Sequence, residues 1–127
     1  MNNVSSPRTC DDGIEQEIKA KGLTAPRVTP ADLEAAISSE HYFTALDGVE
    51  GATGKWDADG YSYALGLLTF CVLVLRNGFT VTGESACASP ENFDAEVGRK
   101  IARENAKQKL WPLMGYALKQ QLSESAA

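Results

Sequence analysis

Residues 67–84, LLTFCVLVLRNGFTVTGE, decide the fold of this chain. Two runs rich in β-branched and aromatic residues flank Asn77-Gly78. An Asn-Gly pair between such runs predicts a β-hairpin whose two-residue loop is a type I′ turn. That turn sets a register in which Leu75 faces Thr80 and Val74 faces Val81. One face of the hairpin then carries only apolar residues, namely Phe70, Val72, Val74, Phe79 and Val81.

The opposite face of the predicted hairpin combines apolar residues on the first strand with polar residues on the second. The first strand contributes Cys71, Leu73 and Leu75, which lie opposite Thr80, Thr82 and Glu84. The first strand is thus apolar on both sides, whereas a strand with one face in water alternates apolar and polar residues. We expect a helix to cover the all-apolar face, and further chain or a second copy to cover Leu73 and Leu75. The predicted partner is therefore another subunit, most simply in a homodimer.

Two sequence patterns predict where helices begin. Thr29-Pro30-Ala31-Asp32 and Ser89-Pro90-Glu91 each place a capping hydroxyl before a proline in the first turn. After the second start, apolar residues keep helical spacing and predict a long helix over the all-apolar face; they are Phe93, Val97, Ile101, Ala102, Ala106 and Leu110. Pro112 lacks the amide hydrogen of a helical hydrogen bond, so we expect a kink or a restart after Trp111.

The remaining segments are assigned from weaker patterns. Residues 14–22 predict a short helix, and residues 42–44 predict a short strand that pairs with an edge of the hairpin. Residues 47–60 contain four glycines and predict a long loop. The expected fold is a single α+β domain over residues 14–122. A central antiparallel hairpin of about three strands packs against a long C-terminal helix and a shorter helix from Pro30. Residues 1–13 and 123–127 are expected to be loose.

The length, net charge and cysteine content of the chain argue against several classes of function. With 127 residues it can bury its own core, so neither a metal nor a disulfide is needed for folding. A formal charge of −5 and a pI near 4.8 argue against generic binding to nucleic acid or to an anionic membrane. The cysteines, Cys10, Cys71 and Cys87, are an odd number without C-x-x-C spacing, which indicates a reduced, cytosolic protein without a zinc site. No apolar run is long enough to span a bilayer, and the N-terminus lacks the pattern of a signal peptide.

The sequence contains partial matches to two ligand-binding motifs, and both lack essential residues. Gly51-Ala52-Thr53-Gly54-Lys55 resembles a phosphate-binding loop, but its glycine spacing is wrong and Trp56 stands where Ser or Thr should bind magnesium. Residues 57–60 resemble the opening of a calcium loop that lacks its closing Glu. We therefore expect no cofactor, no metal and no catalysis. A small enzyme built on Cys87 or on His41, the only histidine, is the least favoured alternative.

The clearest charge pattern is a basic stripe, Arg99, Arg103 and Lys107, at positions i, i+4 and i+8 of the predicted long helix. Such a stripe is most often a solvated helix face. The alternative is that it binds an anion: a phosphate-bearing ligand, an acidic protein or nucleic acid. Trp56 and Tyr61 are then the candidates for stacking on a ring of the ligand, although aromatic clusters more often cap a sheet.

A block within residues 22–122, NGFTVTGESAC…SPENFD…GRKIA…WPL, resembles a family of short tailed-phage proteins. The family is known by gene position, as the gene-forty-nine/gene-sixty-six family of a coliphage and a Shigella phage. This sequence departs from the family pattern around residues 54–63 and at Met114. The resemblance implies a non-structural accessory protein of phages and prophages that acts in the cytoplasm of the infected bacterium, and it implies no catalytic residue.

These observations support one main functional hypothesis and one alternative. The main hypothesis is a non-enzymatic counter-defence protein that either binds and inhibits a host factor or sequesters a nucleotide-like defence signal. Arg99, Arg103 and Lys107 are then the anion contacts, with Trp56 and Tyr61 as stacking candidates. The alternative is a nucleic-acid-binding accessory factor in phage replication or recombination.

Overall fold

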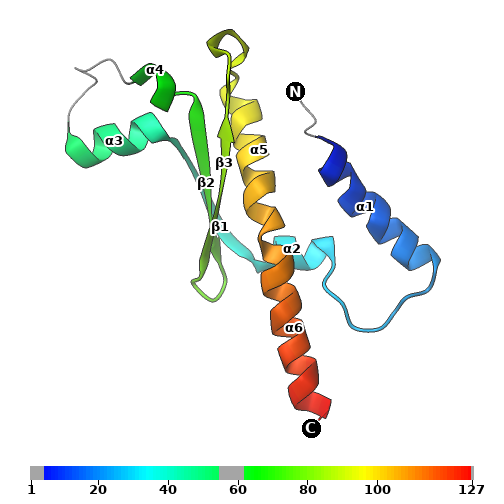
Figure 1. The fold of residues 1–127 in the computed structure, drawn as a ribbon. Coiled ribbons are helices and arrows are strands. Elements are labelled where there is room, and N and C mark those ends of the chain that lie inside the picture. The colour runs from blue at the N-terminus through cyan, green and yellow to red at the C-terminus, as the bar shows by residue number, and fades with distance from the viewer. Residues whose placement is uncertain (1–4, 55–61, 127) are drawn as a thin grey trace.

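The structure is a computed structural model that describes residues 5–54 and 62–126, with the side chains of residues 11–54 and 63–126. Figure 1 shows a small sheet with a long helix along one of its faces and a second helix that continues beyond the sheet. The expected α+β fold class is confirmed. In chain order the elements are α1 (Ser5–Ala20), α2 (Pro30–Ala36), β1 (Ile37–Thr44), α3 (Ala45–Thr53), α4 (Ser62–Leu65), β2 (Leu68–Leu75), β3 (Thr80–Ala86), a 3-10 turn η1 (Pro90–Asn92), α5 (Ala95–Gln108) and α6 (Leu110–Ala126).

The sheet is antiparallel, with strand order β1-β2-β3. The third strand expected around residues 42–44 is present as β1, which begins earlier because the chain passes directly from α2 into it at Ile37. β2 is the central strand, so β1 and β3 are the two edge strands of the sheet that the described residues form. Alternate residues of β2 are buried, and the buried set is Thr69, Cys71, Leu73 and Leu75.

The hairpin between β2 and β3 exists, but its predicted turn type and register are wrong. Leu75 pairs with Phe79: its amide donates to the Phe79 carbonyl at 2.8 Å, and the Gly78 amide donates to the Leu75 carbonyl at 2.8 Å. Of the residues in this three-residue loop only Gly78 has a positive φ, at 90°. Asn77 instead accepts a hydrogen bond on its side-chain oxygen from the Phe79 amide, at 2.9 Å. This is the pattern of a type I turn followed by a glycine bulge.

The changed register exchanges the faces of β3, because side chains alternate along a strand. Val81 now lies opposite Leu73, and Gly83 lies opposite Cys71. These residues share the buried face under α5, whereas we expected the helix to cover the face of Phe70, Val72 and Val74. The expectation that a second copy covers Leu73 and Leu75 is therefore wrong, since both are already buried in the core of the chain itself.

α5 packs on β2 and β3 through small residues. Its buried positions are Gly98, Ala102 and Ala106, and the stripe continues to Leu110 at the start of α6. At Gly83 the helix backbone lies so close to β3 that no side chain fits between them. Val97, which we placed on the buried stripe, is instead 50% exposed. Small residues allow this close approach and account for the core below α5.

The two predicted helix starts have different outcomes. Thr29 caps α2 as expected: its hydroxyl accepts from the Asp32 amide at 3.1 Å, and the Asp32 carboxylate accepts from the Thr29 amide at 2.9 Å. Ser89 makes no side-chain cap and precedes only η1. The long helix begins later, at Ala95, where the Asp94 carboxylate accepts from the Val97 amide at 3.0 Å. A hydroxyl residue followed by proline therefore does not by itself start an α-helix, because the residues after it must also adopt helical structure.

Helical structure also replaces segments that we expected to be irregular. Thr44 and Asp47 form a capping box that starts α3, so residues 45–53 are not part of a long loop. α1 begins at Ser5 and α6 continues to Ala126, where we expected loose chain before residue 14 and after residue 122. α5 ends at Gln108, so Pro112 lies in the first turn of α6, where its missing amide hydrogen costs no helical bond.

Within residues 5–54 and 62–126 no helix is long and apolar enough to cross a membrane. The boundaries proposed for the single domain, residues 14 and 122, stay a prediction.

Candidate functional site

The basic stripe lies on the side of α5 that faces α2 and β1. Arg103 forms a two-point hydrogen bond with Glu34 of α2, with Nη2 to Oε1 at 2.8 Å and Nη1 to Oε2 at 3.1 Å. Its Nε donates to both carboxylate oxygens of Glu40 in β1, each at 3.2 Å. The Arg103 side chain is only 23% exposed. Its guanidinium is therefore held by two carboxylates of the same chain.

Lys107 joins the same cluster one turn further along α5. Its Nζ lies 3.0 Å from Glu34 and 3.7 Å from Glu104, and its side chain is 14% exposed. Burial by itself lowers the pKa of Lys107, but the hydrogen bond to Glu34 and the charge of Glu104 outweigh it, so the pKa is raised. The hydrogen bond from Arg103 is the main reason that the pKa of Glu34 falls to about 2, from an ordinary 4.5. We call Glu34, Glu40, Arg103 and Lys107 the ion cluster; it fastens α5 to α2 and β1.

The other predicted anion-binding residues are not brought together with the ion cluster. Arg99 is exposed and borders a hollow of about 100 Å³ with Tyr42, Phe43 and Asp47. Trp56 and Tyr61 lie outside the residues that the structure describes. Two members of the basic stripe are thus neutralised within the chain, while Arg99 alone presents its charge to solvent.

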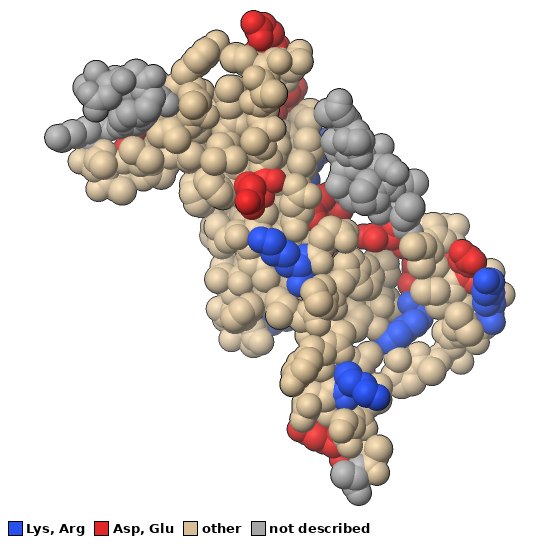
Figure 2. Space-filling view, viewed as in Figure 1, with Lys and Arg blue, Asp and Glu red and all other residues tan. Residues whose placement is uncertain are grey.

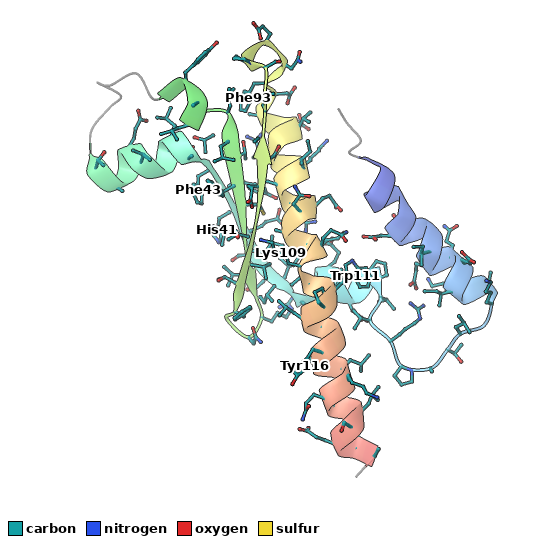
Figure 3. All side chains as sticks on the ribbon, in the orientation of Figure 1. His41, Phe43, Phe93, Lys109, Trp111 and Tyr116 are labelled. Carbon is teal, nitrogen blue, oxygen red and sulfur yellow. The ribbon has the colours of Figure 1, made fainter. Side chains whose placement is uncertain are left out.

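A cleft of about 520 Å³ lies between the end of β3 and the N-terminal half of α5. Its size lies in the range of protein cavities that bind small molecules or inserted side chains. The walls are mainly apolar, and Figure 3 shows Phe93 at this end of the molecule, between β3 and α5. The apolar wall residues are Leu67, Ala86, Ala88, Phe93, Val97 and Ile101. We call this cavity the β3–α5 cleft.

Local structure explains why the cleft forms where it does. The contact at Gly83 holds the middle of α5 against β3. After Ala86 the chain leaves the sheet, forms η1 and comes back alongside the sheet at Asp94, where α5 begins. The space between η1 and α5 stays open because the small residues of α5 do not fill it. The Asn105 amide donates to the Glu84 carbonyl at 2.9 Å and closes one end.

The polar groups of the cleft are acidic or neutral. Asp94 lines it, whereas the Glu84 side chain lies on the other face of the sheet with Phe70 and Thr82, and only the Glu84 backbone carbonyl meets Asn105 at the cleft. Among the described residues the lining includes no Lys, Arg or His. The Cys87 thiol donates to the Ser89 carbonyl at 3.1 Å. The cleft therefore favours an apolar group whose neighbours are neutral or positively charged, and it disfavours a phosphate.

The candidate catalytic side chains are separated in the structure. His41 lies on the face of the sheet away from α5, with its Nε2 3.0 Å from the Ser39 hydroxyl. Cys87 lies in the cleft, and Cys71 is buried in the core, where burial raises its pKa. The described residues contain no group of His, Cys, Asp and Glu side chains that could hold a metal ion.

The sequence prediction missed the β3–α5 cleft. Phe93, Val97 and Ile101 were assigned to the core because of their spacing. The residues that do face the core form another i, i+4 series of small residues, Gly98, Ala102 and Ala106. Two of them, Ala102 and Ala106, lie against Gly83 of β3.

Comparison with known proteins gives one match. Residues 28–122 match the family described as Phage protein (N4 Gp49/phage Sf6 gene 66). The search of curated proteins and that of solved structures gave no match. The matched segment runs from the loop before α2 to the last turns of α6, so it includes the sheet, the ion cluster and the β3–α5 cleft. The family suggests an accessory protein of phage, in agreement with the expected resemblance. The chain belongs to the N4 Gp49/phage Sf6 gene 66 family of phage proteins.

Proposed function

We propose that this phage accessory protein is non-catalytic and binds a protein of the infected bacterium through the β3–α5 cleft. The observation that supports this proposal best is an apolar cavity of about 520 Å³ that, among the described residues, is lined by the acidic Asp94 and by no basic residue. In its proposed counter-defence role, the protein binds a host factor in the host cytoplasm and thereby inhibits it.

The chemistry of the cleft specifies the kind of partner. A large apolar side chain fits the space between Phe93, Val97 and Ile101, and a neighbouring Lys or Arg of the partner can pair with Asp94. In the described part of the chain no strand pairs with the outer edge of β3, where the Glu84 carbonyl accepts from Asn105. An extended segment can add to such an edge and place one side chain in an adjacent cavity. The proposed ligand is thus an extended segment with a large apolar residue next to a basic one.

Sequestration of a nucleotide-like signal receives less support from the geometry. That role needs free cations, and Arg103 and Lys107 are held by Glu34, Glu40 and Glu104. The described residues that line the cleft also include no basic one. Nucleic-acid binding meets the same difficulty in a chain whose formal charge is −5. Arg99 is the member of the basic stripe that either role could still use.

Site-specific photocrosslinking tests the proposal in phage-infected bacteria. The full chain is produced with p-benzoylphenylalanine in place of Val97, at the mouth of the cleft, and separately in place of Leu23. Leu23 is a matched control because it is 56% exposed, close to the 50% of Val97, and lies outside the family match. We expect one host protein to crosslink from position 97 and not from position 23.

A charge placed in the cleft then tests whether the cavity itself binds. Ile101→Glu places a carboxylate inside the apolar lining and should abolish the crosslink from position 97, while Leu23→Glu should leave it unchanged. Circular dichroism of both variants checks that the fold is kept. Identical crosslinking profiles from positions 97 and 23, or a crosslink that survives Ile101→Glu in a folded protein, would contradict the proposal.

A further inference from the structure

The inner end of the β3–α5 cleft contains a buried hydroxyl that the chain itself does not use. Thr69 of β2 lines the cleft and is only 4% exposed. Its side chain forms no hydrogen bond with the residues that the structure describes, and among these residues every fully enclosed polar side-chain atom does have a partner. The Thr69 hydroxyl oxygen is therefore not fully enclosed, and it opens onto a cavity.

The surroundings of the Thr69 hydroxyl indicate that this cavity is the cleft. The oxygen lies 3.2 Å from the position that a Cβ atom would take at Gly98 of α5, and Gly98 lines the cleft as well. Because glycine has no side chain, α5 leaves the hydroxyl uncovered at this position. Thr69 also borders the hollow beside Arg99, but about 100 Å³ is below the usual size of a ligand site, whereas the cleft is within that range.

A second hydroxyl lies beside the first. Ser85 of β3 pairs with Thr69 in the sheet, so the two side chains are on the same face, and Ser85 also lines the cleft. Ser85 is half-buried and, like Thr69, forms no side-chain hydrogen bond with a described residue. The inner end of the cleft thus offers two neighbouring hydroxyls, each of which can donate and accept a hydrogen bond.

These two hydroxyls restrict the kind of side chain that binds well in the cleft. A purely apolar group that reached them would displace their water and leave both without a partner, which lowers the affinity. A group with an apolar body and a polar tip avoids this loss, and Tyr and Trp are the side chains of that kind. Tyrosine carries its polar atom at the far end of the ring, and its hydroxyl can both donate and accept.

The rest of the cleft suits a neutral aromatic ring. Its walls are mainly apolar, and Phe93 can form an aromatic pair with an inserted ring. Asp94 in the lining disfavours a carboxylate or a phosphate on that ring. In the view of Figure 2, the tip of the molecule above β3 and α5 shows acidic and no basic side chains, which also disfavours an anionic group.

We infer that the residue which enters the cleft is a tyrosine of the host partner, and that its hydroxyl forms hydrogen bonds with Thr69 and Ser85. This inference rests on the function proposed for the cleft and narrows it. The partner segment carries an unphosphorylated tyrosine, rather than leucine or phenylalanine, next to its basic residue. On binding, the phenol oxygen takes the place of water at the two hydroxyls.

Two blocked amino acids that differ in a single oxygen atom test the inference. N-acetyltyrosinamide and N-acetylphenylalaninamide are titrated separately into the isotope-labelled full chain, and the shifts of the Val97 and Gly98 amide signals in NMR spectra give the dissociation constants. Because a buried hydroxyl without a partner is costly, the dissociation constant of the tyrosine compound should be at least about tenfold lower. p-Cresol, titrated in the same way, is the probe for a free phenol.

A pair of threonine variants tests whether the Thr69 hydroxyl is responsible. Thr69→Val removes the hydroxyl with little change of shape, so the dissociation constant of the tyrosine compound should rise to that of the phenylalanine compound. Thr82→Val is the matched control, because it makes the same change at an exposed residue on the other face of the sheet, and it should leave both constants unchanged. The comparison of the two compounds in the unaltered chain decides the inference even if Thr69→Val fails to fold.

Each outcome decides the inference, separately from the proposed function. A preference for the tyrosine compound that Thr69→Val removes supports it. Three results would overturn it: equal affinities in the unaltered chain, a preference that persists in folded Thr69→Val, or binding of p-cresol without the tyrosine compound, which indicates a free phenol. A host crosslink from position 97 without a preference for tyrosine contradicts this inference alone. A preference for tyrosine without a host crosslink contradicts the host-binding role and leaves the chemistry of the cleft intact.

Discussion

The backbones of Gly83 in β3 and Ala106 in α5 are in direct contact. A Cβ atom at Gly83 would lie 2.2 Å from the Ala106 nitrogen and 2.3 Å from the Ala102 carbonyl oxygen, and the helix backbone cannot yield as a flexible side chain would. Any residue other than glycine must push α5 away from the sheet.

Gly83→Ala should therefore lower the free energy of unfolding by about 3 kcal/mol or more, because overpacking against backbone displaces a whole helix. Gly115→Ala is the matched control: nothing lies within 4 Å of a Cβ there, and the position is inside α6. It should stabilise the protein by about 0.5–1 kcal/mol. Urea denaturation measures both, and equal effects at the two glycines would contradict the packing described.

Charge reversal of Arg103 should destabilise the fold. Arg103→Glu removes the cation that bridges Glu34 and Glu40 and places a third carboxylate beside them. The two glutamates are partly exposed, so we expect a moderate loss of about 1–3 kcal/mol in the free energy of unfolding.

Arg99→Glu is the control for this variant, because Arg99 is exposed and forms no ion pair with the residues that the structure describes. It should change stability by less than about 0.5 kcal/mol. Denaturant titration of the two variants distinguishes a structural ion cluster from a solvated stripe, in which both changes would be small.

Acid should weaken the fold through Glu34. The hydrogen bond from Arg103 lowers the pKa of Glu34 from 4.5 to about 2. A depressed folded-state pKa adds stability that is complete above the unfolded value and is lost as the pH falls toward the folded value. This contribution should thus be present at neutral pH and should decline below about pH 4.5.

Glu34→Gln should reduce that dependence. At neutral pH the free energy of unfolding of the Glu34→Gln variant should be lower than that of the unaltered chain. This difference in free energy should shrink as the pH falls from 4.5 toward about 2, where Glu34 becomes protonated in the folded protein. Glu96→Gln, in an exposed pair with Lys100, is the control and should behave like the unaltered chain. A constant difference at neutral and acid pH would argue against the assigned role of Glu34.

The two sequence-predicted caps should respond differently to alanine. Thr29→Ala removes a hydroxyl that accepts from the Asp32 amide and should cost about 1 kcal/mol. Ser89 makes no side-chain cap, so Ser89→Ala should cost close to nothing. Thermal unfolding followed by circular dichroism compares them, and a larger loss for Ser89→Ala would be inconsistent with a long helix that starts at Ala95.

Local signals in the sequence were sufficient for part of this fold. The Thr29 cap involves four consecutive residues, and the hairpin follows from two adjacent β-rich runs, so both could be predicted. The type of turn could not, because Asn77 stabilises the loop through its side-chain oxygen rather than by adopting positive φ. That local choice moves the register by one residue and exchanges both faces of β3.

The ion cluster and the β3–α5 cleft could not be predicted, because both are formed by residues far apart in the sequence. The i, i+4, i+8 spacing placed Arg99, Arg103 and Lys107 correctly on one side of α5, but it gave no information about Glu34 and Glu40. The cleft was missed because the larger residues of α5 were taken as its core. The family was recognised from the sequence because its motif is long and specific, and the family match confirms it.

The ion cluster has a consequence for the order of folding during synthesis. Glu40 pairs with a residue 63 positions later, and Glu34 pairs with residues 69 and 73 positions later. Such distant pairings close large loops and form slowly. On the ribosome, α2 and β1 emerge well before the cations that hold them, and β1 also waits for β2 as its partner. The N-terminal half of the nascent chain therefore stays incomplete until α5 has left the exit tunnel, and in that interval it is open to the chaperones and proteases of the cell that synthesises it.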